Sequence, residues 1–396
     1  MAFKFSDAVS GMKPSEIREM NKIATTPGMI SLGGGMPGPE SFPKKELTEI
    51  MVYVMENYGD MAMQYGNTLG ISSAINAISG MLGKTEGFTP DPTQIIVNSG
   101  SQQGLYELGT VLANPGDTII TEEPTYVGAI SAFSGNRLRM EGVEMDSNGM
   151  IVEKLEQTLK KLISEHRAPR FIYTIPTFQN PTGYTMNEER RKHLLEIASG
   201  YDIPVVEDNP YGKLRYYGND VKTMRSMKGG ENVIYLGTFS KVMTPGLRLG
   251  YTVAPEEVME KFNLIKQALD LATNSFSQFV AYEYIRRGII YTQIEENKRI
   301  YRKKRDAMVT ALRENFEGKG EWSEPEGGMF SWLTLKSGAD TRAMKDKAIK
   351  NGVAYVSGQA FSTNGSQKSS MRLNFTFGSV DQITEGVRRI GKIVEE

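Results

Sequence analysis

The chain has 396 residues, enough for two domains, with 46 basic and 47 acidic side chains, two histidines and no cysteine. Its net charge of −1 gives no chain-wide positive field for nucleic acid or an anionic membrane, and the lack of cysteine excludes disulfides and thiolate metal sites. Because His166 and His193 are the only histidines, we expect neither a hydrolase triad nor a metal site built on histidine.

The first residues, from Met1 to Asp7, lack the apolar core of a secretory signal. No apolar run in the chain approaches the length of a membrane span. We therefore expect a cytoplasmic protein that binds neither a membrane nor nucleic acid. The first predicted element is a short helix over residues 13–25, capped by Ser15 or by the turn before it.

A glycine-rich stretch follows, and its Gly33, Gly35 and Gly38 have the spacing of a dinucleotide-binding fingerprint. That fingerprint must open a helix directly after its glycines, whereas Pro37 and Pro39 favour turns and extended backbone here. We therefore reject a dinucleotide site and expect these glycines to let backbone N–H groups approach a different ligand.

Helical patterns at 46–57 and 71–83 are followed by short apolar runs that alternate with segments of helical length. The apolar runs predict buried strands at 95–97, 117–121, 170–174, 204–207 and 233–236. This alternation is typical of a mainly parallel sheet with helices on both faces.

The pattern changes near residue 255, where long helices are predicted at 255–271, 277–287 and 289–316. Strands at 327–333 and 371–375 and a final helix follow. We predict an α/β protein with a three-layer α/β/α large domain at 46–295 and a smaller α+β domain at 296–396. Residues 1–45 are predicted to form an N-terminal arm that contributes to the small domain.

Several chemically active residues fall just after predicted strands, where parallel sheets bind their ligands. Lys241 lies among hydroxyl residues after the run at 233–236, with Arg248 seven residues further on. A lysine forms imines with aldehydes when its amine loses its proton, and desolvation beside a positive charge lowers its pKa. Lys241 is therefore a candidate covalent anchor, with a solvated loop lysine as the alternative.

Two further groups suit a phosphate. The residues from Gly100 to Gln102 open a predicted helix, whose first N–H groups and positive dipole end attract anions. The alternative for Ser101 is an ordinary helix cap. Arg248 suits a bidentate phosphate contact or, alternatively, a structural ion pair.

The remaining candidates suit an aromatic ring. Asp208, at a strand end, can keep a protonated pyridine nitrogen cationic, or can simply form a turn before Asn209 and Pro210. Asn180 and Tyr211 can donate to a ring oxygen, and Tyr126 can stack on the ring, although each alone also fits a turn or a core position. Together with the lysine and the phosphate groups, these residues describe a site for pyridoxal 5′-phosphate.

The chain resembles the fold-type I, class I/II pyridoxal-phosphate aminotransferases over nearly its full length, and within them the 2-aminoadipate, kynurenine and aromatic aminotransferase group. Small departures from the family pattern are Thr238, where many relatives have serine, and Gly33, where close relatives often have alanine. The resemblance is carried by Ser31 to Pro37, Gln64 to Gly66, Gly100 to Gln103, Gln179 to Gly183, Glu207 to Tyr211, Ser240-Lys241, Pro245 to Arg248, and Met371 to Leu373.

The resemblance implies that Lys241 holds the cofactor covalently and moves a proton between the substrate Cα and C4′ of the cofactor. Asp208 and Tyr126 complete the implied catalytic set by pairing with the ring nitrogen and stacking on the ring. The full implied set of cofactor-binding residues is Tyr65, Gly100, Ser101, Gln102, Tyr126, Asn180, Asp208, Tyr211, Thr238, Ser240, Lys241 and Arg248.

For the substrate, the resemblance implies that Arg372 binds the α-carboxylate, helped by Asn180 and the backbone at Gly35. Tyr65 would reach the phosphate of the neighbouring subunit, which implies an obligate homodimer with shared sites. Arg18 matches an N-terminal helix that folds over the site and reads a distal carboxylate, with a solvated helix face as the alternative.

The expected reaction is a ping-pong transamination from 2-aminoadipate, an aromatic amino acid or a similar donor to 2-oxoglutarate, with amino acids and 2-oxo acids as partners and no metal. Another pyridoxal-phosphate reaction, such as elimination by a C–S lyase or decarboxylation, remains an alternative because fold does not fix reaction. A ligand-sensing domain of a transcriptional regulator is a further alternative, although its usual N-terminal helix-turn-helix is missing. The sequence does not rank the amino donors.

Overall fold

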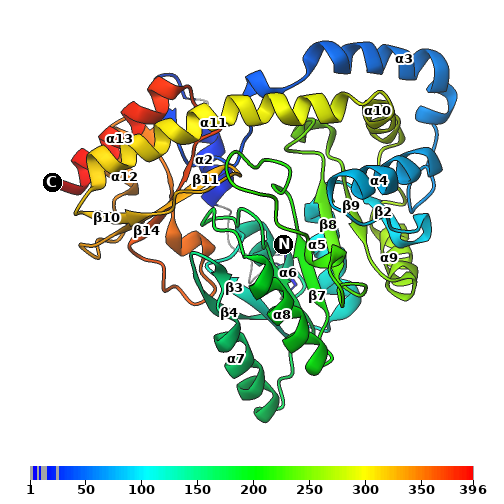
Figure 1. The fold of residues 1–396 in the computed structure, drawn as a ribbon, viewed down its shortest axis with the longest axis horizontal. Helices are drawn as coiled ribbons and strands as arrows, with labels where there is room; N and C mark the ends of the chain where they lie inside the picture. Colours follow the sequence, from blue (N-terminus) through cyan, green and yellow to red (C-terminus); the bar gives the residue numbers. More distant parts are fainter. Residues whose placement is uncertain (1–2, 7–8, 10–15, 24–25, 396) are drawn as a thin grey trace.

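The computed structural model describes residues 3–6, 9, 16–23 and 26–395 (Figure 1). Its central element is an eight-stranded sheet, in which β8, β7, β6, β3 and β4 are parallel neighbours. The strand β9 runs antiparallel to β8 and β2, and β5 runs antiparallel to β4. In sheet order the strands are β2 (Ile95–Asn98), β9 (Gly250–Val253), β8 (Ile234–Thr238), β7 (Val205–Asp208), β6 (Ile172–Thr174), β3 (Thr118–Glu123), β4 (Arg139–Asp146) and β5 (Gly149–Met150).

The three layers follow from the two-residue period of the central strands. Val205 packs into the core beneath α7 (Val152–Ser164) and α8 (Glu188–Gly200). Its neighbour Val206 packs on the other face beneath α5 (Ser101–Leu112), α6 (Val127–Gly135) and α9 (Glu256–Leu269). Near β2 and β9, a further core contains residues of α3 (Lys44–Ala62), α4 (Ser72–Thr85) and α10 (Ser275–Arg286). The predicted α/β/α architecture is confirmed.

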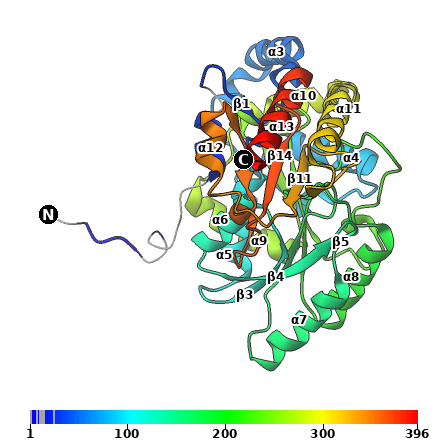
Figure 2. The ribbon, with the colours of Figure 1, turned by 90° about the vertical axis from the view of Figure 1, so that its left-hand side faces the viewer.

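A second, antiparallel sheet forms the centre of the smaller unit. Its order is β10 (Gly320–Trp322), β11 (Phe330–Leu335), β14 (Ser370–Asn374) and β13 (Val356–Ser357). The helices α13 (Val380–Glu395) and α11 (Ile289–Phe316) pack on each other beside it, and the short helix α12 (Lys345–Lys350) follows β11 in sequence (Figure 2). Short 3₁₀ turns lie at Pro39–Ser41, Pro92–Gln94, Met224–Ser226, Pro245–Leu247 and Gly358–Phe361.

The N-terminal segment joins this smaller unit. The strand β1 (Ile30–Ser31) pairs in parallel with β12 (Val353–Ala354), and Met20 of α2 (Glu16–Ile23) is buried in a cluster with Trp332 and Phe361. The predicted helix at 13–25 is thus present as α2, whereas Ser15 lies outside the described residues. Among the described residues, no helix has both the length and the apolar composition needed to cross a membrane.

The helix α11 is continuous through residues 295 and 296, where the large and small domains were predicted to divide. Figure 1 shows it extending from α10, beside the large sheet, to α13 in the smaller unit. The division into three segments stays a prediction, because one helix is shared between the two sheet-containing regions.

Candidate active site

The carboxyl ends of β6, β7 and β8 face β14 of the smaller unit across a cavity of about 200 Å³. The cavity is lined by predicted site residues that are far apart in the sequence. These are Gly35, Ser101, Gln102, Tyr126, Asn180, Asp208, Tyr211, Thr238, Ser240, Lys241, Arg248 and Arg372.

Lys241 lies in the turn directly after β8, and its Nζ donates a hydrogen bond to the carbonyl oxygen of Gly35 at 3.1 Å. Burial of the amine, with smaller effects from the charges of Arg372 and Arg248, lowers its pKa to about 8. A substantial fraction of the amine is therefore neutral near physiological pH, which is the form that attacks an aldehyde.

Asp208 is the last residue of β7 and is only 2% exposed. Its Oδ2 accepts a hydrogen bond from the hydroxyl of Tyr173 at 2.8 Å, while its buried Oδ1 has no partner among the residues that the structure describes. Burial raises the pKa of this carboxyl to about 7, and the Tyr173 hydrogen bond opposes that rise. A buried acceptor without a donor fits a ligand that brings its own N–H, such as a protonated pyridine ring.

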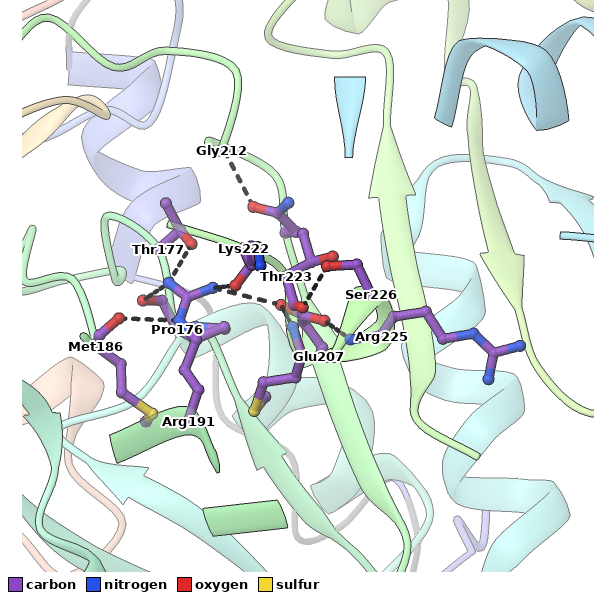
Figure 3. A network of polar contacts seen from close by, with 12 residues as sticks. Pro176, Thr177, Met186, Arg191, Glu207, Gly212, Lys222, Thr223, Arg225 and Ser226 are labelled. Atoms are coloured by element: carbon purple, nitrogen blue, oxygen red, sulfur yellow. Dashed lines mark hydrogen bonds and ion pairs between the residues drawn. The ribbon is translucent and has the colours of Figure 1, made fainter. Parts of the chain in front are cut away.

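The neighbouring residue Glu207 points to the opposite face of β7, into the polar network of Figure 3. Its carboxylate accepts from the backbone N–H groups of Met224 at 3.0 Å and Arg225 at 2.9 Å, and it lies 3.8 Å from the Arg191 guanidinium. Arg191 in turn donates to the carbonyl oxygens of Pro176, Met186 and Lys222 and to the Thr177 hydroxyl. This network fixes the chain segments before Asn180 and after Tyr211.

Arg372 is fully buried on β14, with its guanidinium 4.1 Å from the ring centre of Phe330. It donates to Oδ1 of Asn180 at 2.9 Å and to the carbonyl oxygen of Gly33 at 2.8 Å. The Nδ2 of Asn180 donates to the Tyr211 hydroxyl at 3.1 Å. Burial lowers the pKa of Arg372 only to about 10, so a fixed cation lies in the cavity wall and is suited to a carboxylate.

An anion cradle lies at the start of α5. Gly100 precedes that helix at φ 77°, and a Cβ there would lie 2.6 Å from Nη2 of Arg248. Glycine therefore lets the guanidinium approach the free N–H groups of the helix. The Thr238 hydroxyl donates to Oγ of Ser240 at 3.0 Å and accepts from the Ser240 N–H at 3.1 Å, which places both hydroxyls on the same cavity wall. A helix N-terminus with an arginine and two hydroxyls fits a phosphate.

Tyr126 immediately precedes α6, and Gln102 is held beside it because its Nε2 donates to the carbonyl oxygen of Gly128 at 2.8 Å. A Cβ at Gly128 would lie 2.4 Å from the Tyr126 ring, so the glycine leaves room for that ring in the cavity wall.

Two predicted site residues, Tyr65 and Gly100, are not among the residues that line the cavity, although Gly100 belongs to the anion cradle described above. Tyr65, in the turn after α3, is 86% exposed. Arg18 falls within α2, but its side chain lies outside the described residues. The structure adds Tyr173, Phe330 and Met36, which the sequence reasoning missed. The only sequence signal for Tyr173 was its position in a predicted strand, which carries no sign of its partner.

The described residues contain no group of three or more His, Asp or Glu side chains placed to bind a metal. The cavity offers instead an amine of lowered pKa, a carboxylate oxygen without a partner among the described residues, an anion cradle and a buried arginine. This donor set fits pyridoxal 5′-phosphate together with an α-carboxylate.

Comparisons with known proteins agree with this chemistry. Residues 34–390 match the family profile described as aminotransferase class I and II. The chain is 44% identical over 392 residues to aromatic-amino-acid aminotransferase 1 of Thermococcus litoralis, covering 99% of this chain and 94% of that one. It is 34% identical over 395 residues to 2-aminoadipate transaminase of Thermus thermophilus, covering 99% and 96%. The crystal structure of Pyrococcus horikoshii kynurenine aminotransferase superposes with a TM-score of 0.95 at 45% identity, covering 99% of this chain and 96% of that chain.

Proposed function

The chain belongs to the class I and II aminotransferases and is a transaminase that depends on pyridoxal 5′-phosphate, and we propose that the cavity at the ends of β6 to β8 is its active site. When bound, this cofactor supplies an electron sink for the bonds at the amino acid Cα. The observation that carries the assignment is that Lys241, the unpaired oxygen of Asp208 and the Arg248 cradle line one cavity.

In this proposal Lys241 attaches the cofactor and then moves a proton at the substrate Cα, because its lowered pKa allows it both to accept and to release a proton near neutrality. Asp208 holds the ring nitrogen, and Asn180 and Tyr211 hold the ring oxygen. The phosphate is bound by Gly100, Ser101, Gln102, Thr238, Ser240 and Arg248, and the ring is stacked by Tyr126.

Arg372 is proposed to bind the α-carboxylate of each amino acid and 2-oxo acid in turn, with Asn180 and the backbone at Gly35 beside it. We propose 2-aminoadipate or an aromatic amino acid as donor and 2-oxoglutarate as acceptor, since the similar proteins carry the names of such donors. Arg18 is proposed to read a distal carboxylate, because α2 packs on the unit that carries Arg372.

We further propose an obligate homodimer in which Tyr65 reaches the phosphate of the partner subunit. Support comes from the exposed apolar surface around it, since single chains rarely leave large apolar side chains gathered in one region. The large apolar or aromatic side chains exposed on α3 and in the turn after it are Val52, Met55, Met61, Met63 and Tyr65. The expected cytoplasmic location stays a prediction.

A mixed-dimer experiment tests the shared site. Lys241→Ala and Tyr65→Ala chains are each expected to have little activity, but a hybrid dimer regains one complete site, with Lys241 from one chain and Tyr65 from the other. Co-expression with two different tags isolates the hybrid, whose activity should approach half that of the wild type. An inactive hybrid would contradict a Tyr65 that acts across subunits.

The reaction itself is tested with a panel of amino donors, with 2-oxoglutarate present or withheld. Repeated turnover should require the acceptor and should disappear in Lys241→Ala. Product formed over many turnovers without acceptor would favour elimination or decarboxylation instead. Repeating the panel on Arg18→Ala tests the side-chain reader, because an equal loss for acidic and aromatic donors would remove that role.

A further inference from the structure

Tyr173 is a buried residue of β6, the strand next to β7, that takes no direct part in lining the cavity. Its hydroxyl donates to Oδ2 of Asp208 at 2.8 Å. The ring is fully buried, and it packs edge-on against Phe133 with ring centres 5.5 Å apart and planes at 77°. Since core side chains rest in fixed rotamers, the hydroxyl is a rigid donor at one place.

Among the residues that the structure describes, the other charged and titratable groups near Asp208 do not donate a hydrogen bond to its carboxylate. The Glu122 carboxylate is occupied by Gln179, Thr174 and the backbone N–H of Ile175. Tyr211 accepts from Asn180, and Tyr126 has no hydrogen bond to Asp208 among those that the structure shows. Tyr173 is therefore the sole side-chain donor to Asp208 in the described part of the chain.

The two oxygens of Asp208 consequently differ. Oδ2 accepts from Tyr173, whereas the buried Oδ1 has no donor within the residues that the structure describes. A hydrogen bond from a buried donor to one oxygen restrains the carboxylate and leaves the other oxygen available. The same bond stabilises the ionised form more than the neutral acid, because a hydroxyl donates more strongly to a charged acceptor.

We propose that Tyr173 is a positioning residue that orients Asp208 and keeps it ionised, so that Oδ1 can hold the protonated ring nitrogen of the cofactor. This inference rests on the proposed role of Asp208 as partner of that nitrogen. Tyr173 touches neither cofactor nor substrate in this arrangement and acts only through the carboxylate.

The direct test is Tyr173→Phe in the full-length enzyme, because this change removes one hydroxyl and leaves the ring in place. We expect pyridoxal 5′-phosphate to bind roughly tenfold more weakly, as is typical for the loss of a hydrogen bond to a charged group. The kcat should fall while the KM for the amino donor stays unchanged, because Arg372 is untouched. Tyr301→Phe is the matched control, since that buried hydroxyl bonds to Ser41, at 2.7 Å, and to the backbone of Gly38 rather than to Asp208, and its kinetics should equal the wild type.

A double-mutant cycle separates positioning from a merely structural role. In an Asp208→Asn background, Tyr173→Phe should change cofactor affinity less than twofold, because the charged acceptor is already gone. A full tenfold loss in that background, or wild-type affinity in Tyr173→Phe alone, would overturn the inference. If Asp208→Asn itself binds the cofactor as tightly as the wild type, both the role of Asp208 and this inference are wrong. Thermal unfolding of each variant without cofactor shows whether any loss reflects the fold.

Discussion

Glu207 and Asp208 are consecutive carboxylates at the end of β7, yet the protein satisfies them in opposite ways. Burial raises the pKa of each to about 7. Glu207 receives two backbone N–H groups and faces the Arg191 guanidinium (Figure 3), whereas Asp208 receives one hydroxyl on one oxygen. The two carboxylates are therefore alike in burial and pKa. They differ in their partners within the described chain, because both oxygens of Glu207 are bonded on one face of the strand and only one oxygen of Asp208 is bonded on the other.

The comparison shows which observation points to function. A perturbed pKa alone does not separate these residues, because structural ion pairs perturb pKa values as well. The unbonded Oδ1 of Asp208 does separate them, since buried polar groups in folded proteins nearly always have hydrogen-bond partners. We interpret Glu207 as a group that stabilises the fold and Asp208 as one that awaits a ligand.

The largest effect is expected for Asp208→Asn, which tests whether Asp208 acts in the reaction. The neutral amide cannot stabilise a protonated ring nitrogen, so we expect turnover to fall on the order of a hundredfold or more, as when one partner of a buried charge pair is removed. The fold should persist, because the amide oxygen can still accept from Tyr173 and the other position has no partner among the described residues. Steady-state kinetics and unfolding curves measure the two effects, and wild-type turnover would place Asp208 with Glu207 as a structural residue.

A smaller effect, on stability rather than turnover, is expected for Glu207→Gln. The change leaves the buried Arg191 charge without its counter-ion, which costs about 3 kcal/mol in comparable cases. Urea unfolding of the cofactor-free protein measures the loss, and kcat should change little. Glu385→Gln, which breaks partly exposed pairs with Arg388 and Arg389 on the helix surface, is the control and should leave stability nearly unchanged. A Glu207→Gln enzyme that is stable but inactive would reverse the two assignments.

The smallest effect concerns pH. Both folded pKa values lie above those of the unfolded chain, so the folded protein binds more protons between about pH 4 and 7 and its stability falls as pH rises through that window. Each substitution, Glu207→Gln or Asp208→Asn, should flatten this slope in the cofactor-free protein. Saturating pyridoxal 5′-phosphate should remove only the contribution of Asp208 to this slope, because the protonated ring nitrogen favours the ionised form of Asp208. Urea midpoints at two pH values within the window measure the slopes, and no change on adding cofactor would contradict an ionised Asp208.

Much of the architecture was predictable because its signals are local. Apolar runs such as Val205-Val206 marked the central strands, and the residues directly after them met at one edge because parallel strands end on the same side. The same rule brought Asp208 and Lys241 into one cavity. The strand β4 was missed because it lies near the sheet edge and its mostly polar residues stay partly exposed, which interrupts the apolar signal.

Other features depend on tertiary contacts that no local pattern encodes. The Tyr173 hydroxyl bonds to Asp208 on the neighbouring strand, 35 positions away in the sequence. In the sequence, Glu207 is as good a candidate carboxylate as Asp208. Only the fold shows that Arg191 and the turn at Met224–Ser226 surround it. The Tyr65 prediction depends on a second subunit, so a single chain does not test it.

The continuity of α11 has a mechanical consequence. At about 1.5 Å per residue, its 28 residues form a rod roughly 40 Å long that is anchored in both sheet-containing regions. Near one third of its length, the Asn297 side chain donates to the carbonyl oxygen of Lys241 at 3.4 Å. This helix therefore ties the backbone of Lys241 to an element that packs in both sheet-containing regions of the chain.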